Sequence, residues 1–434
     1  MKKHPVIFYG WIIVATSLIV KALAYSARYS FSVIFPSLLE EFHWPRDATA
    51  GMLSVHLLFY GLVSPVAGGL VDRIGPRKTM AFGTMLLSLG MFLSRWGSEP
   101  WHFYLSFGVL SGAGLCLMGS VPITAVLRNW FERKRGLAFS LVHCGVGGSF
   151  ATYPAIAFLI NRTGWRNTFV VEALIITAVV LPLIAFVMRY HPREKGLVRD
   201  GVVEAGDPSP ASVNETLRIT NGAWAAVDWT LSKAARTSRF WLLCLMTFSV
   251  WGIAQHIMVA HHVAFAIDAG YSKLYASSVI SLFGIMFALG SLAAIISDRI
   301  GREPTFTIGA AIGIAGILVL MLIKDTSHPW MLYCYAISLG FGLGMISPTI
   351  TASLTDIFQG PMVGSVIGFV WFSFAMGGTI GPWLGGWIFE FTGNYMPAFI
   401  LSAALLAVAC AAIWLAAPRN VRLVPGRVKN RQNR

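Results

Sequence analysis

Two basic side chains interrupt the first long apolar stretch of the chain. Lys21 and Arg28 lie within residues 9–34, together with Tyr25 and Ser32. The spacing i, i+4, i+7 and i+11 places these four side chains within about 60° of one helical face. A cation that faces lipid at the bilayer centre costs at least about 2.5–3.5 kcal/mol. We therefore expect the stripe to face an aqueous cavity or a partner, where its cations could bind an anionic group.

A structural explanation stays open for both cations. Arg28 could pair with Glu172 in the sixth apolar stretch, or it could extend its guanidinium toward the membrane surface. Lys21 lies too deep in the stretch to reach the surface easily, so a buried polar contact is its alternative.

A corresponding stripe is predicted in the second half of the chain. Gly10-Trp11 and Phe240-Trp241 begin apolar stretches that are about 230 positions apart, which indicates an internal repeat. Adding this offset to the first stripe leads to four further residues: Trp251, Gln255, Met258 and His262. Because both stripes carry hydrogen-bonding groups, we expect both helices to line a binding site.

The histidines do not form a metal-binding set. His256, His261 and His262 do not share one helical face, and no metal-ligand spacing occurs. His143 can titrate near neutral pH and is the candidate for binding a coupled proton, with a satisfied polar contact as the alternative. No nucleophile–base pair or phosphate-binding loop is present, so we expect neither an enzyme nor a cofactor.

The composition is that of a membrane protein. Hydrophobic residues make up 56% and charged residues 12% of the chain, whereas globular proteins carry about 25% charge. The five cysteines fall within apolar stretches, which predicts packing rather than disulfides. The net charge of +14 comes from cations clustered between these stretches, so membrane topology explains it better than nucleic-acid binding. The first apolar stretch is too long for a cleavable signal peptide.

Twelve apolar stretches are long enough to cross a bilayer as helices. They are expected at residues 9–34, 48–71, 79–95, 101–127, 136–160, 167–189, 240–267, 275–297, 304–323, 329–354, 362–388 and 395–416. About 25 cations lie on the side of both termini and about 6 on the other, which places both termini in the cytoplasm. We expect a multi-pass protein of the cell inner (plasma) membrane.

These stretches divide into two halves. Residues 1–189 and 239–416 are the predicted six-helix bundles, residues 190–238 a cytoplasmic linker, and residues 417–434 a basic cytoplasmic tail. Near the end of the linker, apolar residues at helical spacing predict one short amphipathic helix at the membrane surface. These residues are Trp224, Val227, Leu231, Ala234 and Ala235.

A charged turn joins the second and third stretches and recurs in the second half. The first copy runs from Gly68 to Lys78, and the second is Ser297-Asp298-Arg299-Ile300-Gly301-Arg302. The first copy resembles the loop signature of the major facilitator superfamily. Arg133 to Ala138, preceded by Trp130-Phe131, resembles the fifth-helix entry of its monocarboxylate-transporter and oxalate–formate-exchanger branch. The resemblance implies an all-α carrier of twelve transmembrane helices in two pseudo-symmetric six-helix bundles, working by alternating access.

The same signature implies a set of gating residues. These are Asp72, Arg73, Arg77, Arg135, Asp298 and Arg299. Asp72 could pair with Arg135 and hold one conformation until the pair breaks; a charged turn that only fixes topology is the alternative. The second copy departs from the family, because Ala294 replaces a glycine and Glu303 replaces a cation.

Glycines on the eleventh stretch have the spacing of an antiporter-type signature that usually lies on helix five. They are Gly368, Gly377, Gly381, Gly385 and Gly386. We favour close helix packing over an antiport function.

The leading hypothesis is a secondary carrier of a small organic anion, a monocarboxylate, coupled to protons. Its substrate-binding residues would be Lys21, Tyr25, Arg28, Ser32, Trp251, Gln255 and His262. The resemblance is partial, because the first-helix cation of monocarboxylate carriers aligns with Tyr29 and no cation occupies the eighth stretch. An exporter of aromatic compounds and a membrane sensor are the alternatives. No metal or nucleic acid is expected, and a monomer is the working assumption.

Overall fold

The computed structural model describes residues 8–131, 135–198, 219–359 and 363–424, without the side chains of residues 72, 135, 136, 363 and 364. It divides into two compact units. Unit 1 comprises Met1–Glu204, His262–Ile267 and Ser272–Gly284, and unit 2 comprises Ala205–His261, Asp268–Tyr271 and Ile285–Arg434. This division groups residues that contact one another and does not test the predicted six-helix bundles. The bundles, residues 1–189 and 239–416, therefore stay a prediction.

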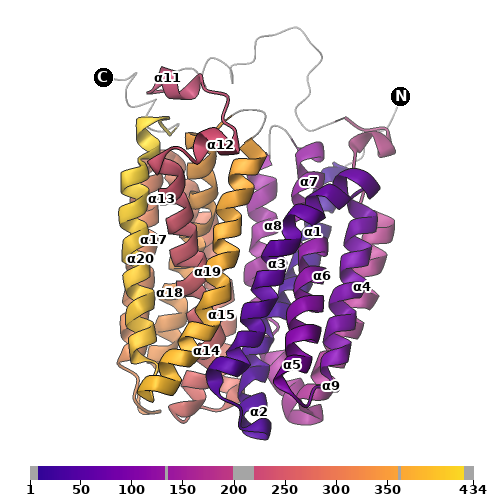
Figure 1. Cartoon of the computed structure of the whole chain (residues 1–434), viewed down its shortest axis with the longest axis vertical. Helices are drawn as coiled ribbons and strands as arrows, with labels where there is room; N and C mark the ends of the chain where they lie inside the picture. The colour runs from indigo at the N-terminus through magenta and orange to yellow at the C-terminus, as the bar shows by residue number, and fades with distance from the viewer. Residues whose placement is uncertain (1–7, 132–134, 199–218, 360–362, 425–434) are drawn as a thin grey trace. The chain divides into compact units, whose positions relative to one another are not determined.

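The helices of the first half all belong to unit 1 (Figure 1). They are α1 (Tyr9–Tyr29), α2 (Phe31–Phe42), α3 (Arg46–Ile74), α4 (Pro76–Ser94), α5 (Pro100–Phe103), the π-helix η1 (Tyr104–Ser111), α6 (Gly112–Met118), α7 (Ser120–Trp130), α8 (Arg135–Phe150), α9 (Tyr153–Pro182), η2 (Leu183–Val187) and η3 (Pro192–Lys195). Tyr9 donates a hydrogen bond to the Val187 carbonyl at 2.8 Å, so the start of the first crossing meets the end of the sixth.

The second half begins with two short linker helices. They are α11 (Gly222–Ala225) and α12 (Leu231–Ala234). The helices that follow are α13 (Ser238–Thr247), the π-helix η4 (Phe248–Ala254), α14 (Gln255–Asp268), α15 (Lys273–Ala293), η5 (Ala294–Ile296), α16 (Ser297–Ile300), α17 (Arg302–Met321), α18 (Trp330–Ile357), α19 (Val363–Thr392), α20 (Met396–Ala416) and η6 (Pro418–Asn420).

The predicted twelve crossings are confirmed. Ten stretches of the described residues are long and apolar enough to span a membrane. One of them, Leu137–Val187, has 51 residues, enough for two crossings of about 20 residues each. Gly164 lies at its turn, with a φ of 80° that an L side chain rarely adopts. The remaining crossing is α4, whose 19 residues follow α3 directly.

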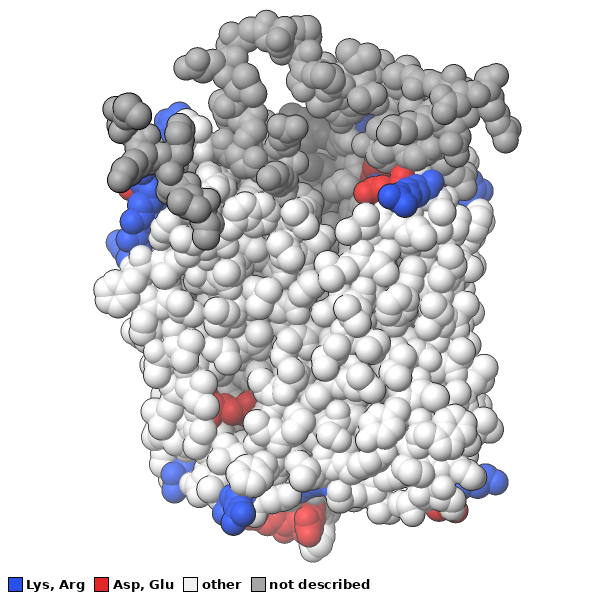
Figure 2. Space-filling model, turned by 180° about the vertical axis from the view of Figure 1, so that it is seen from behind, with Lys and Arg blue, Asp and Glu red and all other residues white. Residues whose placement is uncertain are grey.

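The outer surface matches a lipid environment. Large apolar side chains are exposed along the helices, including Phe186 at 76% and Leu174 at 61%. Figure 2 shows charged side chains gathered toward the two ends and a broad, nearly uncharged band between them. Such a band would be a liability in water but is the expected surface in a bilayer.

Glycines allow the first and fifth crossings of each half to pack closely. A Cβ atom on Gly145 of α8 would lie 2.7 Å from the Leu18 carbonyl oxygen of α1. A Cβ atom on Gly377 of α19 would lie 2.5 Å from the Phe248 carbonyl oxygen of η4. No side chain fits at such distances, which supports the packing interpretation of the glycine signature.

In the described part of the linker after residue 218, α11 and α12 are two separate helical turns where the sequence pattern predicted one amphipathic helix. Asn221 and Thr230 each cap a separate turn by accepting a backbone N–H bond, so the chain restarts between them. The Trp224 indole donates to the Ile357 carbonyl at 2.8 Å, and the Trp229 ring lies 5.1 Å from the Phe358 ring. The linker therefore packs on the end of α18, and these contacts form in place of one continuous amphipathic helix.

Candidate functional site

The predicted stripe on α1 is buried within unit 1. The exposed fraction of Arg28 is 0%, that of Lys21 is 4% and that of Tyr25 is 7%. Burial of two cations in a membrane helix is costly unless partners offset their charge. The surroundings of these residues therefore decide what the stripe can do.

The Arg28 guanidinium lies over two aromatic rings. Its central carbon is 4.3 Å from the Tyr60 ring centroid and 5.1 Å from the Tyr25 ring centroid. Nε, Nη1 and Nη2 have no hydrogen-bond partner among the described residues, and the alternative pair with Glu172 does not form. Cation–π contacts stabilise the charge and leave a planar set of N–H donors available. This is the geometry that receives a carboxylate through two parallel hydrogen bonds.

Two hydroxyl groups from other helices hold Tyr25 in place. The Tyr25 hydroxyl lies 3.2 Å from that of Tyr60 on α3 and 3.1 Å from that of Ser120 on α7. These contacts fix the ring that faces Arg28. Sequence analysis missed Tyr60 and Ser120, because an isolated hydroxyl in an apolar stretch carries no signal of its partner.

Lys21 and His143 form a direct polar contact. Lys21 Nζ lies 3.3 Å from His143 Nδ1 and 5.8 Å from the Tyr25 ring centroid. An ammonium group has only donors, so Nδ1 accepts this bond. The bare backbone of Gly145 lets α8 approach α1 beside Lys21, since a Cβ atom there would lie 3.2 Å from Lys21 Cβ. The structure thus joins the predicted proton-binding residue to the predicted anion-binding stripe.

Ser32 makes its hydrogen bonds at the break between α1 and α2. Its hydroxyl donates to the Tyr29 carbonyl at 2.9 Å and lies 3.0 Å from the Tyr153 hydroxyl. The Tyr153 hydroxyl also donates to the Tyr29 carbonyl at 2.7 Å. Ser30, between the two helices, keeps right-handed helical dihedrals and donates its N–H to the Ser26 carbonyl, so the role of Ser32 in substrate binding stays a prediction.

The second stripe is buried as well. The exposed fraction is 6% for Trp251, 2% for Gln255 and 4% for His262. Trp251 and Gln255 belong to unit 2, whereas His262 belongs to unit 1, where its ring stacks 6.4 Å from that of Tyr153.

Two other histidines make structural contacts. His256 Nδ1 lies 2.8 Å from the Trp251 carbonyl oxygen, and His261 Nε2 lies 2.8 Å from the Pro382 carbonyl oxygen. Both rings bond backbone carbonyls at irregular parts of helices, η4 and the proline of α19. In the part of the chain that the structure describes, no three His, Cys, Asp or Glu residues could hold a metal ion.

Comparisons with known proteins identify the family. The family model described as "Major Facilitator Superfamily" matches residues 17–378 and 292–432. The chain belongs to this superfamily. Monocarboxylate transporter 13 of Bos taurus is 28% identical over 410 residues, covering 92% of this chain and 87% of that protein. Monocarboxylate transporter 2 of Homo sapiens is 25% identical over 415 residues, covering 94% and 84% respectively.

A solved structure supports the same fold. It is a bacterial homologue of the human lysosomal transporter Spinster, in an inward-facing and unoccupied conformation. It has a TM-score of 0.67 at 14% identity and covers 95% of this chain and 98% of that one. The predicted resemblance to the monocarboxylate-transporter branch of the superfamily is confirmed, and the chain is a multi-pass membrane transporter of a small molecule rather than an enzyme.

The second copy of the superfamily loop signature is held by ion pairs within unit 2. Arg302 lies 2.7 Å from Asp298 and 2.8 Å from Asp356 at the end of α18, and it donates to the Ser297 hydroxyl at 2.6 Å. Arg302 and Asp356 are both nearly buried. Sequence analysis placed Asp298 in the gate but missed Arg302, because its main partner lies 54 positions away.

The first copy is described only in part. Arg77 donates to the Ala185 carbonyl, and Arg73 is exposed, as is Arg299 in the second copy. The side chains of Asp72 and Arg135 lie outside the described residues, so their predicted pairing stays a prediction.

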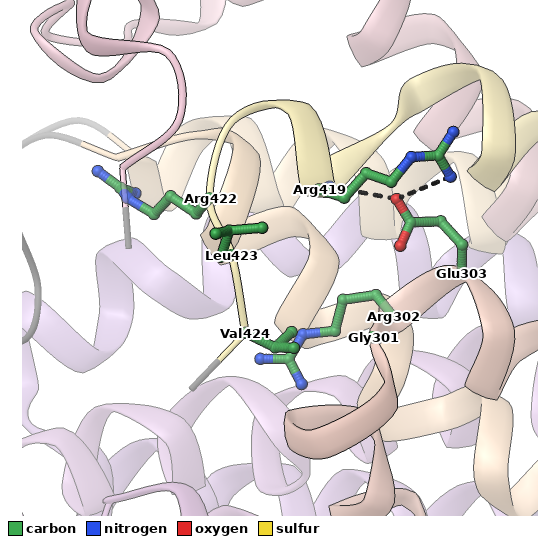
Figure 3. A pocket seen from close by; sticks show the side chains of 7 residues that line it. All are labelled: Gly301, Arg302, Glu303, Arg419, Arg422, Leu423 and Val424. Carbon is green, nitrogen blue, oxygen red and sulfur yellow. Dashed lines mark hydrogen bonds and ion pairs between the residues drawn. The ribbon is translucent and has the colours of Figure 1, made fainter. Parts of the chain in front are cut away.

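A small pocket adjoins the second copy (Figure 3). Its lining residues are Gly301, Arg302, Glu303, Arg419, Arg422, Leu423 and Val424. Glu303 lies 3.7 Å from the Arg419 guanidinium and accepts the Arg419 backbone N–H at 3.1 Å. The cavity volume of about 10 Å³ is close to what one water molecule needs. The pocket is therefore too small for an organic anion, and its ion pair ties η6, the short helix after α20, to α17.

Proposed function

We propose that this transporter is a secondary active carrier of a small monocarboxylate, coupled to protons and working by alternating access. The observation that carries the proposal is the fully buried Arg28 guanidinium, which lies over the Tyr25 and Tyr60 rings and whose N–H donors have no hydrogen-bond partner among the described residues. A buried cation without a partner is costly, and a carboxylate offsets that cost more completely than a neutral ligand. The names of the relatives agree with this ligand class.

The charge of the site favours a single carboxylate. Arg28 offers one planar set of N–H donors, which suits one carboxylate. The second cation, Lys21, is already hydrogen-bonded to His143. A dianion would leave its second carboxylate with only the shared Lys21 ammonium. Lys21 serves better as a reserve of positive charge beside one carboxylate than as a second anchor.

We expect the purified carrier to prefer monoanions over dianions. Lactate-like, aromatic monocarboxylate and oxalate-like anions would compete for one binding signal at fixed pH and ionic strength, with protein stabilisation as the readout. At least one monoanion is expected to bind about tenfold more tightly than the dianion. Tighter binding of the dianion than of every monoanion would contradict the proposal.

An exporter of aromatic compounds is the second candidate function. It is favoured by clustered aromatic rings in unit 2, such as Trp371 and Phe374 at 6.0 Å and Trp251 and Phe287 at 5.9 Å. In the same competition, binding of neutral or cationic aromatics without any monocarboxylate would select the exporter. Binding without uptake in sealed vesicles would instead indicate a sensor.

We also propose that the protein lies in the cell inner (plasma) membrane with both termini in the cytoplasm. The excess of cations on the side of the termini supports this orientation. Reporter fusions at Asp207 and after Arg434 are expected to give a cytoplasmic signal. A periplasmic signal from either fusion would contradict the proposed topology.

A further inference from the structure

A buried carboxyl group that the proposed mechanism does not use lies in unit 1, on the sixth crossing. Glu172 follows the turn at Gly164 by eight residues, which places it about 12 Å into the crossing at 1.5 Å per residue. Its exposed fraction is 8%, and its Oε2 atom has no hydrogen-bond partner among the described residues. Ionisable side chains at such depth are costly, and in membrane proteins they often bind or relay protons.

The Ser30 side chain, between α1 and α2, lies within hydrogen-bonding reach of this carboxyl group. Both donors of Ser30 are already used, because its backbone N–H bonds the Ser26 carbonyl at 2.7 Å and its hydroxyl donates to the Ala27 carbonyl at 3.2 Å. The hydroxyl oxygen can then only accept a further hydrogen bond. Glu172 must therefore be the donor, and a carboxyl group donates only when it carries a proton.

The surroundings of Glu172 supply no compensating charge. α9 packs against α1, α2, α4 and η2, and its Phe169 ring lies 6.3 Å from the Phe107 ring of η1. The charged or titratable groups on α9 and on these elements are Tyr9, Lys21, Tyr25, Arg28, Tyr29, Glu40, Glu41, Arg77, Lys78, Tyr104, Tyr153, Arg162 and Arg166. None of these cations forms an ion pair with Glu172 in the part of the chain that the structure describes. A buried carboxyl group without a cation takes up a proton in preference to staying ionised.

The contact between Glu172 and Ser30 joins the sixth crossing to the helix that carries the buried stripe. Ser30 follows Arg28 by two positions, and its helical dihedrals continue the backbone of α1 into α2. A protonated Glu172 braces this junction. Loss of the proton would leave a buried carboxylate beside a hydroxyl whose own proton bonds the Ala27 carbonyl, so the contact is expected to open and admit water.

We propose that Glu172 is a proton-binding site that holds the sixth crossing against the first, and that loss of its proton releases this contact. The inference goes beyond the proposed function, because it requires neither the anion nor His143. The conformation described here is then favoured below the pH at which Glu172 ionises, and it is weakened as the pH rises through that value. The first crossing, with Arg28 on it, becomes sensitive to pH through a group outside the stripe.

Thermal unfolding of the purified full-length protein, without added anion, is measured from mildly acidic to alkaline pH. The wild type is expected to lose stability as the pH rises. Glu172→Gln is expected to remove that part of the pH dependence, because the amide is neutral at every pH and still donates to Ser30. Ser30→Ala is expected to move the loss about one pH unit lower, as removal of one hydrogen bond to the protonated form predicts. The effect of Glu172→Gln is expected to persist in the His143→Gln background.

Infrared spectroscopy gives a direct readout of the bound proton. The carbonyl stretch of a protonated carboxylic acid is expected in the wild type at neutral pH and is expected to be lost in Glu172→Gln. Glu390→Gln is the matched control, because it makes the same substitution at an exposed position of α19. It is expected to change neither the infrared band nor the pH dependence.

Three outcomes would overturn the proposal. The first is an infrared band or a pH dependence that Glu172→Gln leaves unchanged. The second is failure of Glu172→Gln to fold, because the amide reproduces the neutral donor. The third is stabilisation of the wild type by sodium, at fixed pH and ionic strength, that Glu172→Gln abolishes while the wild type shows no protonated-carboxyl band; the site would then bind a sodium ion in place of a proton.

Discussion

Arg28→Ala is expected to lower monocarboxylate affinity by at least about 30-fold and to reduce uptake to background. The expectation follows from loss of the guanidinium that would bind the carboxylate, because removing one partner of a buried charge pair costs about 2–5 kcal/mol. Arg28→Lys keeps the charge but loses the planar fork, so it is expected to recover only part of the affinity. Uptake is measured in vesicles and normalised to monodisperse extracted protein.

Arg162→Ala is the control for this experiment. Arg162 also stacks on an aromatic ring, with its guanidinium carbon 5.4 Å from the Phe158 ring centroid, but it is exposed. It is expected to transport normally. Normal transport by Arg28→Ala would exclude α1 as a wall of the site. Failure of Arg28→Ala and Arg28→Lys to fold would instead give Arg28 a structural role.

The crossings and the buried cations of α1 could be predicted because the bilayer constrains them directly. A spanning helix needs about 20 apolar residues, so each crossing can be recognised from its own stretch of sequence. The cost of a cation in lipid likewise made Lys21 and Arg28 stand out before any contact was known. Both features depend on one helix and its solvent, and neither requires knowledge of a partner.

The contacts that complete the site could not be predicted in the same way. Tyr60 and Ser120 reach Tyr25 from two other helices, and a single sequence contains no record of which neutral hydroxyls meet. The Ser32 hydroxyl likewise meets the Tyr153 hydroxyl of another helix, a contact that the periodicity of one apolar stretch could not predict. Tertiary contacts decided both points.

The two copies of the loop signature show how similar sequences can be held differently. Arg77 in the first copy donates to a backbone carbonyl, whereas Arg302 in the second binds the carboxylates of Asp298 and Asp356. The internal repeat predicted two charged turns, but two of the partners, the Ala185 carbonyl and the Asp356 carboxylate, lie outside the repeat motif. Repetition in sequence therefore predicts position better than it predicts ion pairing.

His143→Gln is expected to abolish proton-driven accumulation while leaving exchange of bound anion. In the contact with Lys21, His143 Nδ1 accepts a hydrogen bond from Lys21 Nζ at 3.3 Å. Adding a proton to Nδ1 would remove that bond and place two cations side by side, which a carboxylate bound nearby would offset. Proton binding and anion binding then favour each other, and this coupling is reciprocal. Among the described residues, Tyr25 and Cys144 are further titratable groups beside Lys21, and Arg28 lies over the Tyr25 ring.

The measurement uses proteoliposomes with an imposed pH gradient. A difference of two pH units can drive up to about 100-fold accumulation if one proton moves with each anion, since each pH unit is worth about 1.4 kcal/mol. The amide introduced by His143→Gln would still accept a hydrogen bond from Lys21 but could not carry the proton, so the anion should only equilibrate. His328→Gln, in an exposed loop, should accumulate anion like the wild type. If His143→Gln accumulates anion at the wild-type level, another group carries the proton. If the variant loses both anion exchange and accumulation, His143 is needed to bind the anion itself.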